Sequence, residues 1–369
     1  MRKLLPLAVA ALAVAPLSQA NDNLRVSGFG SIIGAQVIDG HGYVADYPNL
    51  GIYDNDFDLA KESKFGLQAV ATINDKTSFT TQAMSRAANN YDPQVEWMFL
   101  NYAIQDDLEL QVGKLRLPVY YFSEYMDVGY AYPWIRVPSD AYSLDVTNFN
   151  GMQLNYRTYM GPLNITATAF GGRQENVNDP LMSYLFPSQI DRKFTGLVGA
   201  GLEFSTDSTI VKLTYTEADM EQTRSGSPDF NNDGISGDAD GVTNTAIEFY
   251  DVYVQQSFGD FAVMGEYNEY KPFYESWFVS ATYNMDKFTY YVMHSQFELD
   301  GPFEKHDTQS LGFRYEADAR MAFKFDVSQL TDEGYIPVAG AADIPKPVNK
   351  APDGDGDLII ISTGIDFIF

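Results

Sequence analysis

The feature that most constrains this chain is a long series of short segments in which apolar and polar residues alternate. Such alternation places apolar side chains on one face of a β-strand and polar side chains on the other. Near residue 70, for example, Phe65, Leu67 and Ile73 share one face, while Lys64 and Gln68 share the other. We predict sixteen strands, at 24–38, 64–74, 77–87, 94–104, 108–115, 149–158, 162–171, 195–204, 208–217, 245–258, 260–270, 275–284, 286–296, 308–318, 320–330 and 358–369.

The links between these segments have a regular rhythm. Turns of one to three residues alternate with longer links, and five of the eight longer links exceed 20 residues. In an up-and-down arrangement all the long links lie at one end. Short turns at one end and long loops at the other are typical of a transmembrane β-barrel of an outer membrane. A soluble exported β-protein is the alternative, but it has no reason to gather its long loops at one end.

Composition removes several other classes of protein. The 369 residues include no cysteine, which excludes a disulfide scaffold and a cysteine-based zinc site. A net charge of −26 argues against a nucleic-acid partner, which requires a basic face. With 45% hydrophobic and 14% aromatic residues, the chain is not disordered.

The first twenty residues have the pattern of a secretory signal peptide. Arg2 and Lys3 precede an apolar run from Leu4 to Leu17, and Ser18-Gln19-Ala20 forms a small-residue cleavage site. We therefore predict a signal peptide at 1–20 and one barrel domain at 21–369. Beyond the signal no run of 18 apolar residues remains, so no transmembrane helix is predicted.

Tyrosines recur near the strand ends, on the apolar face. Transmembrane barrels carry aromatic girdles where their outer surface meets the two membrane interfaces. We expect these tyrosines to form such girdles: Tyr102, Tyr156, Tyr215, Tyr250, Tyr267, Tyr283 and Tyr315.

With these features the sequence resembles the Gram-negative outer-membrane porins. The resemblance rests on the sixteen-strand rhythm, the long third link and the terminal strand Ile365-Asp366-Phe367-Ile368-Phe369. It implies an all-β, 16-stranded antiparallel barrel with an inward-folded third loop, a homotrimer, contacts with outer-membrane lipid and lipopolysaccharide, and a Phe369 that the barrel insertion machinery reads. The Pro-Glu-Phe-Gly-Gly motif of enteric porins is absent and the second long link is short, which indicates a distant branch.

The third long link, about 116–148, is rich in aromatic residues. Eight aromatic side chains in one loop need a buried environment, which folding into the barrel would supply. An outward loop packed against a trimer neighbour is the alternative. The predicted constriction residues are Arg116, Tyr120, Tyr121, Glu124, Asp127, Trp134, Arg136, Asp140 and Asp145.

Selectivity in such a channel depends on the charges that line the lumen. By strand parity the inward basic residues are Lys64, Arg86, Arg157, Lys212, Arg314 and Lys324. In the family a basic wall faces carboxylates of the third loop. The resemblance suggests that Arg86 and Arg157 face Glu124, Asp127 and Asp140 here.

Three long links, at 39–63, 218–244 and 331–357, carry 18 acidic and four basic residues. We expect an acidic outer mouth that gives a weak cation preference, which falls as salt screens these charges. One stretch resembles an EF-hand loop, with Asp229, Asn231 and Asp233 followed by Asp240 in place of the usual final Glu. Calcium is therefore a possible ligand, and no other cofactor is predicted.

The predicted function is passive diffusion of small hydrophilic solutes and ions through an outer-membrane porin. Two alternatives stay open: a nutrient-selective channel that uses the aromatic third loop, and a structural or lipopolysaccharide-binding barrel. No enzymatic activity is predicted. His294 falls on a strand and His306 in a loop, and neither has a recognisable catalytic partner.

Overall fold

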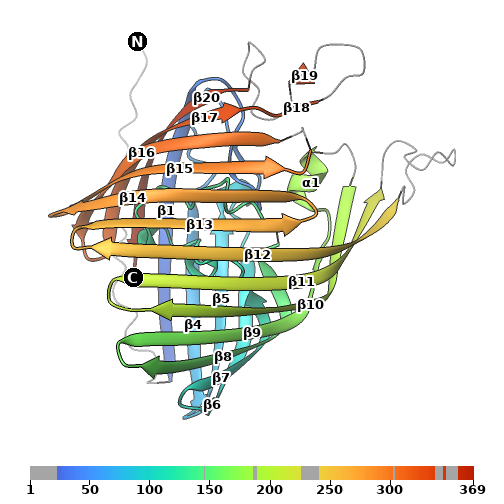
Figure 1. The fold of residues 1–369 in the computed structure, drawn as a ribbon, viewed down its shortest axis with the longest axis vertical. Helices are drawn as coiled ribbons and strands as arrows, with labels where there is room; N and C mark the ends of the chain where they lie inside the picture. Colours follow the sequence, from blue (N-terminus) through green and yellow to red (C-terminus); the bar gives the residue numbers. More distant parts are fainter. Residues whose placement is uncertain are drawn as a thin grey trace.

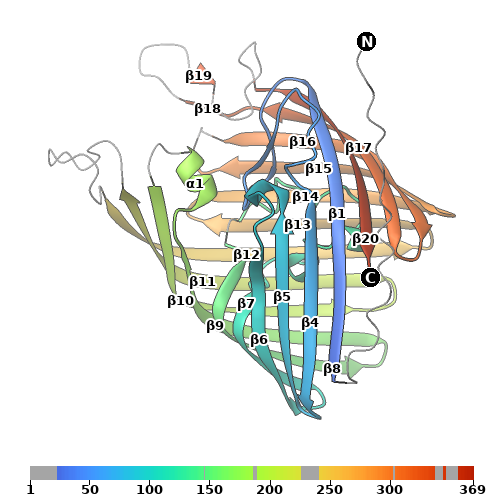
Figure 2. The same ribbon diagram turned by 180° about the vertical axis from the view of Figure 1, so that it is seen from behind.

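A computed structural model shows a closed antiparallel barrel of sixteen strands (Figures 1 and 2). It describes residues 23–144, 146–185, 189–225, 241–301, 304–336, 344–345 and 356–369. The signal peptide prediction, Asp145 and the four predicted calcium ligands lie outside these residues. Among the described residues, no helix has the length and apolar character needed to span a membrane.

The barrel strands match the predicted series in number and order. Several are longer than predicted at the end that carries the long loops, and β10, β11 and β12 each reach 17 residues. The strands are β1 (Leu24–Asp39), β4 (Lys64–Asn74), β5 (Thr77–Arg86), β6 (Gln94–Gln105), β7 (Leu108–Arg116), β8 (Asn148–Met160), β9 (Leu163–Asn176), β10 (Gln189–Ser205), β11 (Thr209–Ser225), β12 (Val242–Phe258), β13 (Phe261–Lys271), β14 (Tyr274–Met285), β15 (Phe288–Leu299), β16 (Lys305–Asp318), β17 (Met321–Asp332) and β20 (Leu358–Ile368).

The first and last strands close the barrel. Phe29 on β1 pairs with Ile368 on β20, and the ladder continues along both strands. The Phe369 main chain exchanges two hydrogen bonds of 2.9 Å with Gly28, and its ring stacks on Phe65. Closure leaves no free edge in the barrel, which a β-structure within a bilayer requires.

The fourth barrel strand, β6, breaks the simple alternation at a β-bulge. The pairing of β5 with β6 shifts between Gln82 and Ala83, so that Ala83 pairs with Val95 and Gln82 with Trp97. Glu96 is the extra residue at this shift, and both Glu96 and Trp97 line cavities inside the barrel. A bulge places two consecutive side chains on one face, so Glu96 and Trp97 both point into the barrel.

The outer surface of the barrel is apolar. Large aliphatic side chains on alternating positions remain exposed, among them Leu67, Val112, Val252, Val279 and Leu311. The seven tyrosines predicted as girdle residues all fall on this outward parity. Because no soluble protein leaves such a continuous apolar band in water, the barrel spans a membrane through its strands.

Smaller elements occupy the long loops. A hairpin of β2 (Tyr43–Asp46) and β3 (Gly51–Tyr53) follows β1, and a single-turn helix α1 (Pro180–Leu185) follows β9. A two-residue pair, β18 (Tyr335–Ile336) and β19 (Ile344–Pro345), lies between β17 and β20. Three 3₁₀ turns complete the set, η1 (Ala87–Asn89), η2 (Ser123–Tyr125) and η3 (Gly129–Ala131). The sequence predicts none of these elements, because each is too short to show a repeat of apolar residues.

Candidate channel and constriction

The third long loop, residues 117–147, packs against side chains that point inward from the barrel wall. Trp134 donates a hydrogen bond from Nε1 to Ser280 Oγ on β14, 3.0 Å away, and its ring meets Phe278 edge-on. The ring of Tyr121 stacks on Tyr253 of β12 at 3.8 Å with parallel planes. Five of the eight aromatic residues noted in the sequence pack on rings of β12 and β14: Tyr120, Tyr121, Phe122, Trp134 and Tyr142.

Polar contacts tie the same loop to the same wall. The Tyr142 hydroxyl and the Tyr121 backbone N–H both donate to the Glu266 carboxylate of β13, the latter over 2.7 Å. Burial, and next the Glu266 charge, raise the pKa of Tyr142 well above its usual range, so it remains a neutral donor. Asn268 donates to the Ala141 carbonyl over 3.0 Å.

Three of the predicted inward cations bind backbone carbonyls of this loop. Lys324 Nζ donates to the carbonyls of Gly129 and Trp134 and also lies 2.8 Å from Asp366. Arg314 donates to the Tyr130 carbonyl over 2.5 Å, and Lys212 to the Tyr120 carbonyl over 2.7 Å. These cations hold the loop in place by donating hydrogen bonds to its main-chain carbonyls.

Glycine is required where the loop touches the closing strands. A Cβ atom on Gly129 would lie 2.2 Å from Asp366 Oδ1 and 2.7 Å from Ser31 Oγ. Neither neighbour can retreat freely, because Ser31 donates to Asp366 over 2.6 Å within the wall. The η3 turn therefore approaches β1 and β20 more closely than any residue with a side chain would allow.

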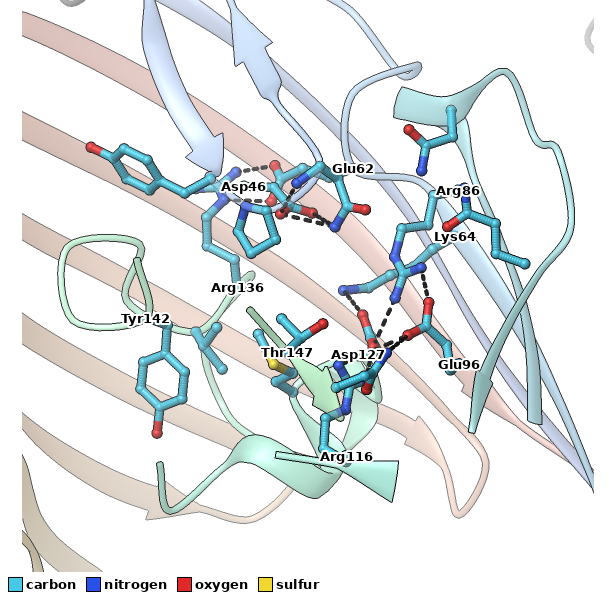
Figure 3. Close-up of a pocket in the computed structure, with 18 of the residues that line it drawn as sticks. Asp46, Glu62, Lys64, Arg86, Glu96, Arg116, Asp127, Arg136, Tyr142 and Thr147 are labelled. Atoms are coloured by element: carbon cyan, nitrogen blue, oxygen red, sulfur yellow. Dashed lines mark hydrogen bonds and ion pairs between the residues drawn. The ribbon is translucent and has the colours of Figure 1, made fainter. Parts of the chain in front are cut away.

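On the other side of the lumen, Asp127 of the loop lies among three cations (Figure 3). Its carboxylate accepts hydrogen bonds from Arg116 at 2.5 Å and Arg86 at 2.9 Å, and it lies 3.5 Å from Lys64. Arg86 also pairs with Glu96. We call these five residues the ionic cluster; they come from β4, β5, β6, β7 and the loop.

Electrostatics keep the Asp127 carboxylate charged. Burial acts to raise its pKa, but the positive charges of Arg86, Arg116 and Lys64 outweigh burial and hold the pKa well below its usual range. A depressed pKa means that the cluster contributes stability above the ordinary aspartate pKa of about 4, and loses it only as pH falls through the lower folded value.

A second ionic contact lies across the same cavity (Figure 3). Arg136 of the loop makes a two-pronged contact with Glu62, at 2.7 Å and 2.6 Å, and also donates to Ser362 of β20. Asp46 of the β2–β3 hairpin accepts from Asn49 nearby. Paired guanidinium and carboxylate groups fix geometry as well as charge, so Arg136 joins the first and third loops to the wall.

A buried histidine joins the same three regions. His306 is 0% exposed, and its ring nitrogens lie 3.2 Å from Asp140 of the third loop and 3.2 Å from the Tyr47 hydroxyl of the first. Asp140 also accepts from Ser295 of β15 over 2.7 Å. Burial acts to raise the pKa of Asp140, but the His306 interaction lowers it below its usual value.

Three cavities follow one another along the β4–β7 side of the lumen. The first, about 260 Å³, adjoins the outer strand ends and is lined by the ionic cluster. The second, about 430 Å³, also borders Arg116 and continues past Gln111 and Ser78. The third, about 530 Å³, shares Glu124 and Trp97 with the second and reaches Phe369 at the rim with the short turns.

The loop residues mark where this path is divided. Asp127 faces the first cavity and Glu124 the second and third, while Arg116 borders both the first and the second. The 2.5 Å contact between Arg116 and Asp127 therefore lies between the outer and inner compartments. We refer to the three cavities together as the polar path.

Comparison with known proteins bears on the fold. No protein-family model and no curated protein matches the sequence. Among solved structures, OmpT of Vibrio cholerae is 14% identical with a TM-score of 0.56, covering 95% of this chain and 99% of that one. The anion-selective porin from Comamonas acidovorans is 11% identical with a TM-score of 0.57, covering 94% and 99%.

The outer-membrane channel DcaP of Acinetobacter baumannii gives a TM-score of 0.58 at 8% identity, covering 94% of this chain and 97% of that one. The likeness extends over nearly the whole length of each protein. This chain has the fold of an outer-membrane porin. The porin fold and the apolar outer surface together place it in a Gram-negative outer membrane.

Within this porin fold, the predicted constriction residues occupy different places. Arg116 is the last residue of β7 rather than a loop residue, and Asp127 and Arg136 form ion pairs. Tyr120, Tyr121 and Trp134 pack in the aromatic part of the loop, whereas Glu124 is exposed to the inner cavities.

The suggested facing of two arginines with three loop carboxylates is met only by Arg86 and Asp127. Arg157 is exposed near the short-turn end of β8 and forms no described ion pair, and Asp140 contacts His306 instead. The prediction that His306 lies in a loop is wrong. It belongs to β16, because that strand begins at Lys305, three residues earlier than the alternation indicated.

Several residues of the site are not indicated by the sequence pattern. Glu96 was hidden by the bulge, and Glu62 was counted only as part of an acidic loop. Lys114 lines the outer cavity and donates to the Val95 carbonyl. Among the described residues no cluster of three or more potential metal ligands occurs.

Proposed function

We propose that the protein is a passive diffusion channel for small hydrophilic solutes and ions, and that solutes follow the polar path. The observation that carries this proposal is the succession of three cavities with shared lining residues, from the outer strand ends to the opposite rim. The first two cavities are lined largely by charged and amide side chains, many of them on β4 to β7, and the third adds Arg25, Gln82 and Arg320. A hydrated solute needs such groups to exchange its water for protein contacts.

The ionic cluster lines the first cavity of the path and reaches the second through Arg116. There Asp127 and Glu96 oppose Arg86, Arg116 and Lys64, so both signs of charge are close to a passing ion. Because positive and negative charges are nearly balanced at the ionic cluster, the acidic outer loops decide whether cations or anions are preferred. We expect a weak cation preference that declines as ionic strength rises.

Reconstitution into a planar bilayer tests the proposal. The expected result is stepwise conductance that grows with salt concentration, together with swelling of proteoliposomes in small sugars and none in large oligosaccharides. A barrel that inserts, as judged by resistance to heat in detergent, yet neither conducts nor admits sugars would contradict it.

We further propose a homotrimer. A solved structure of the Vibrio cholerae OmpT, which shares this fold, is described as a trimer form. The exposed aliphatic surface of β1 and β4, with Ile32 and Leu67, offers an apolar face for a neighbouring copy. The mass of the detergent complex, measured by light scattering with the detergent contribution subtracted, should equal three chains; a mass of one chain would exclude the trimer.

A further inference from the structure

A fourth cavity lies in the outer mouth, in the sector opposite the polar path. Its volume is about 320 Å³, and its walls come from the inward faces of β10, β11 and β13 to β15. Unlike the first two cavities of the polar path, it is lined mainly by apolar groups, including Tyr270, Phe273 and Leu299. We call it the apolar pocket. It meets the outer compartment of the polar path at Tyr47, which borders both.

The cover of the apolar pocket comes from two loops that are far apart in the sequence. Val44 and Ile52 of the β2–β3 hairpin approach from one side, and Leu181 of α1 from another. Val44 and Leu181 are buried although both belong to outer loops. Outer loops that face water have no general need of buried aliphatic side chains, so their convergence here builds an enclosed apolar site.

A buried hydroxyl within the lining lacks a partner. Tyr270 is 5% exposed, and no described residue accepts or donates a hydrogen bond at its Oη. Leaving a buried hydroxyl unsatisfied is costly, and native structures rarely tolerate it without a water or ligand. An acceptor atom on a bound molecule would satisfy it.

The charges at the pocket favour an anionic acceptor. Arg192 and Arg224 both line it, against one carboxylate, Glu304. Arg192 is held by Asp179 over 2.6 Å, which keeps its guanidinium fixed beside the pocket. Two guanidinium groups therefore border an apolar wall, although Asp179 balances the charge of Arg192 and the outer loops as a whole are acidic.

We propose that the apolar pocket binds the ring-containing body of a small organic anion, and so concentrates such solutes beside the entrance of the polar path. Ligand sites are typically cavities of this size in which apolar walls bind the body of the ligand and a few polar groups orient it. Here the rings and aliphatic side chains would take the apolar body, while Tyr270 and the two arginines face the anionic group.

Equilibrium binding to the intact protein in lipid nanodiscs tests this site without any need for conduction. The probe is 2-naphthoate, titrated calorimetrically against protein-loaded and empty nanodiscs, with gluconate as a hydrophilic anion of the same charge. The expected result is saturable binding of 2-naphthoate and none of gluconate. Equal binding of both, or no excess over empty nanodiscs, overturns the proposal. Weaker binding of 2-naphthylmethylammonium supports the anionic preference, and tighter binding overturns it.

A matched pair of variants locates the site. Leu299→Gln places an amide in the apolar wall and should weaken 2-naphthoate binding about tenfold, whereas Leu299→Met keeps the wall apolar and should bind as the parent does. Equal affinities in the two variants would place the probe elsewhere. Conductance without the probe should be the same in both, so a loss of binding is distinguishable from a failure of the channel proposal.

Discussion

The two halves of the lumen use the same residue types for different purposes. On the β4–β7 side, Lys64, Arg86 and Arg116 meet carboxylates around a cavity. On the β11–β17 side, Lys212, Arg314 and Lys324 donate to main-chain carbonyls of the third loop, among closely packed rings. A lumen-facing cation therefore does not by itself mark a solute path. What it binds decides whether it faces solutes or holds a loop.

This contrast has a physical basis in the loop sequence. Aromatic residues near Tyr120 and Trp134 bury against the wall and exclude water, which leaves the loop carbonyls in need of donors. Long cations from the strands supply them. The Asp127 side chain instead lines a cavity, where the three cations keep its carboxylate charged.

The largest expected effect comes from the aromatic side. Trp134→Ala removes a fully buried ring and the hydrogen bond to Ser280, which should cost about 3–5 kcal/mol of the free energy that holds the loop against the wall. Single-channel records should show larger and noisier currents. Trp277 lies on β14, the strand that carries Ser280, but on its lipid-facing side. Trp277→Ala should therefore leave the current unchanged. If Trp134→Ala gave currents as quiet and as small as those of the parent, the remaining contacts of the third loop would be sufficient to hold it against the wall.

The next effect comes from the polar side. Asp127→Asn keeps the shape of the side chain but leaves Lys64, Arg86 and Arg116 with one carboxylate fewer. Ion pairs at this range are worth several kcal/mol before screening, so the cation-to-anion permeability ratio should fall about tenfold at low salt. Reversal potentials under a potassium chloride gradient measure it. Glu124→Gln, three residues earlier but exposed, should change the ratio less than about twofold. Equal shifts in both variants would argue against a special role for the ionic cluster.

Acid should have a smaller effect than removal of Asp127. The pKa of Asp127 is held well below its usual range. Its contribution to stability is therefore complete above the ordinary aspartate pKa, and it is lost only as pH falls through the lower pKa of the folded state. Ion selectivity of the parent channel should therefore change little between pH 7 and about 4.5. A marked fall within this window that is present in the parent but absent from Asp127→Asn would show that Asp127 is protonated there, and hence that the three cations do not lower its pKa as described.

The smallest effect is expected at Arg157. This residue shares the inward parity of the wall arginines but is exposed near the short-turn end and joins no described ion pair. Arg157→Gln should leave the permeability ratio within about twofold of the parent and stability within about 0.5 kcal/mol. A shift as large as that of Asp127→Asn would place the selective point of the path close to the inner rim.

The strands were predictable because each one repeats a simple rule. Alternation and link lengths identified all sixteen, since one face must meet lipid and the other the lumen. The extra residues of β10 to β12 were not, because beyond the bilayer neither face has to be apolar. At the bulge in β6 the alternation breaks, so the sequence pattern did not predict that Glu96 points inward.

The candidate site was predictable only in its parts. The resemblance to porins suggested that Arg86 faces Asp127, as it does in the structure, but it grouped Arg157 and Asp140 with them, and those two lie elsewhere. That depends on how an irregular loop crosses the lumen, which aromatic packing and Gly129 determine together. His306 gave no signal, because its partners Tyr47 and Asp140 are 259 and 166 positions away and lie in loops without a period.

The central claim is that solutes pass along the β4–β7 side and not the β11–β17 side. The chain has no cysteine, so single Ser→Cys variants report without background. Ser78 on β5 lines the second cavity of the polar path, whereas Ser276 on β14 is 0% exposed behind the third loop. A charged, water-soluble methanethiosulfonate reagent should reduce the current through Ser78→Cys and leave that through Ser276→Cys unchanged. Block of Ser276→Cys with no effect on Ser78→Cys would contradict the account.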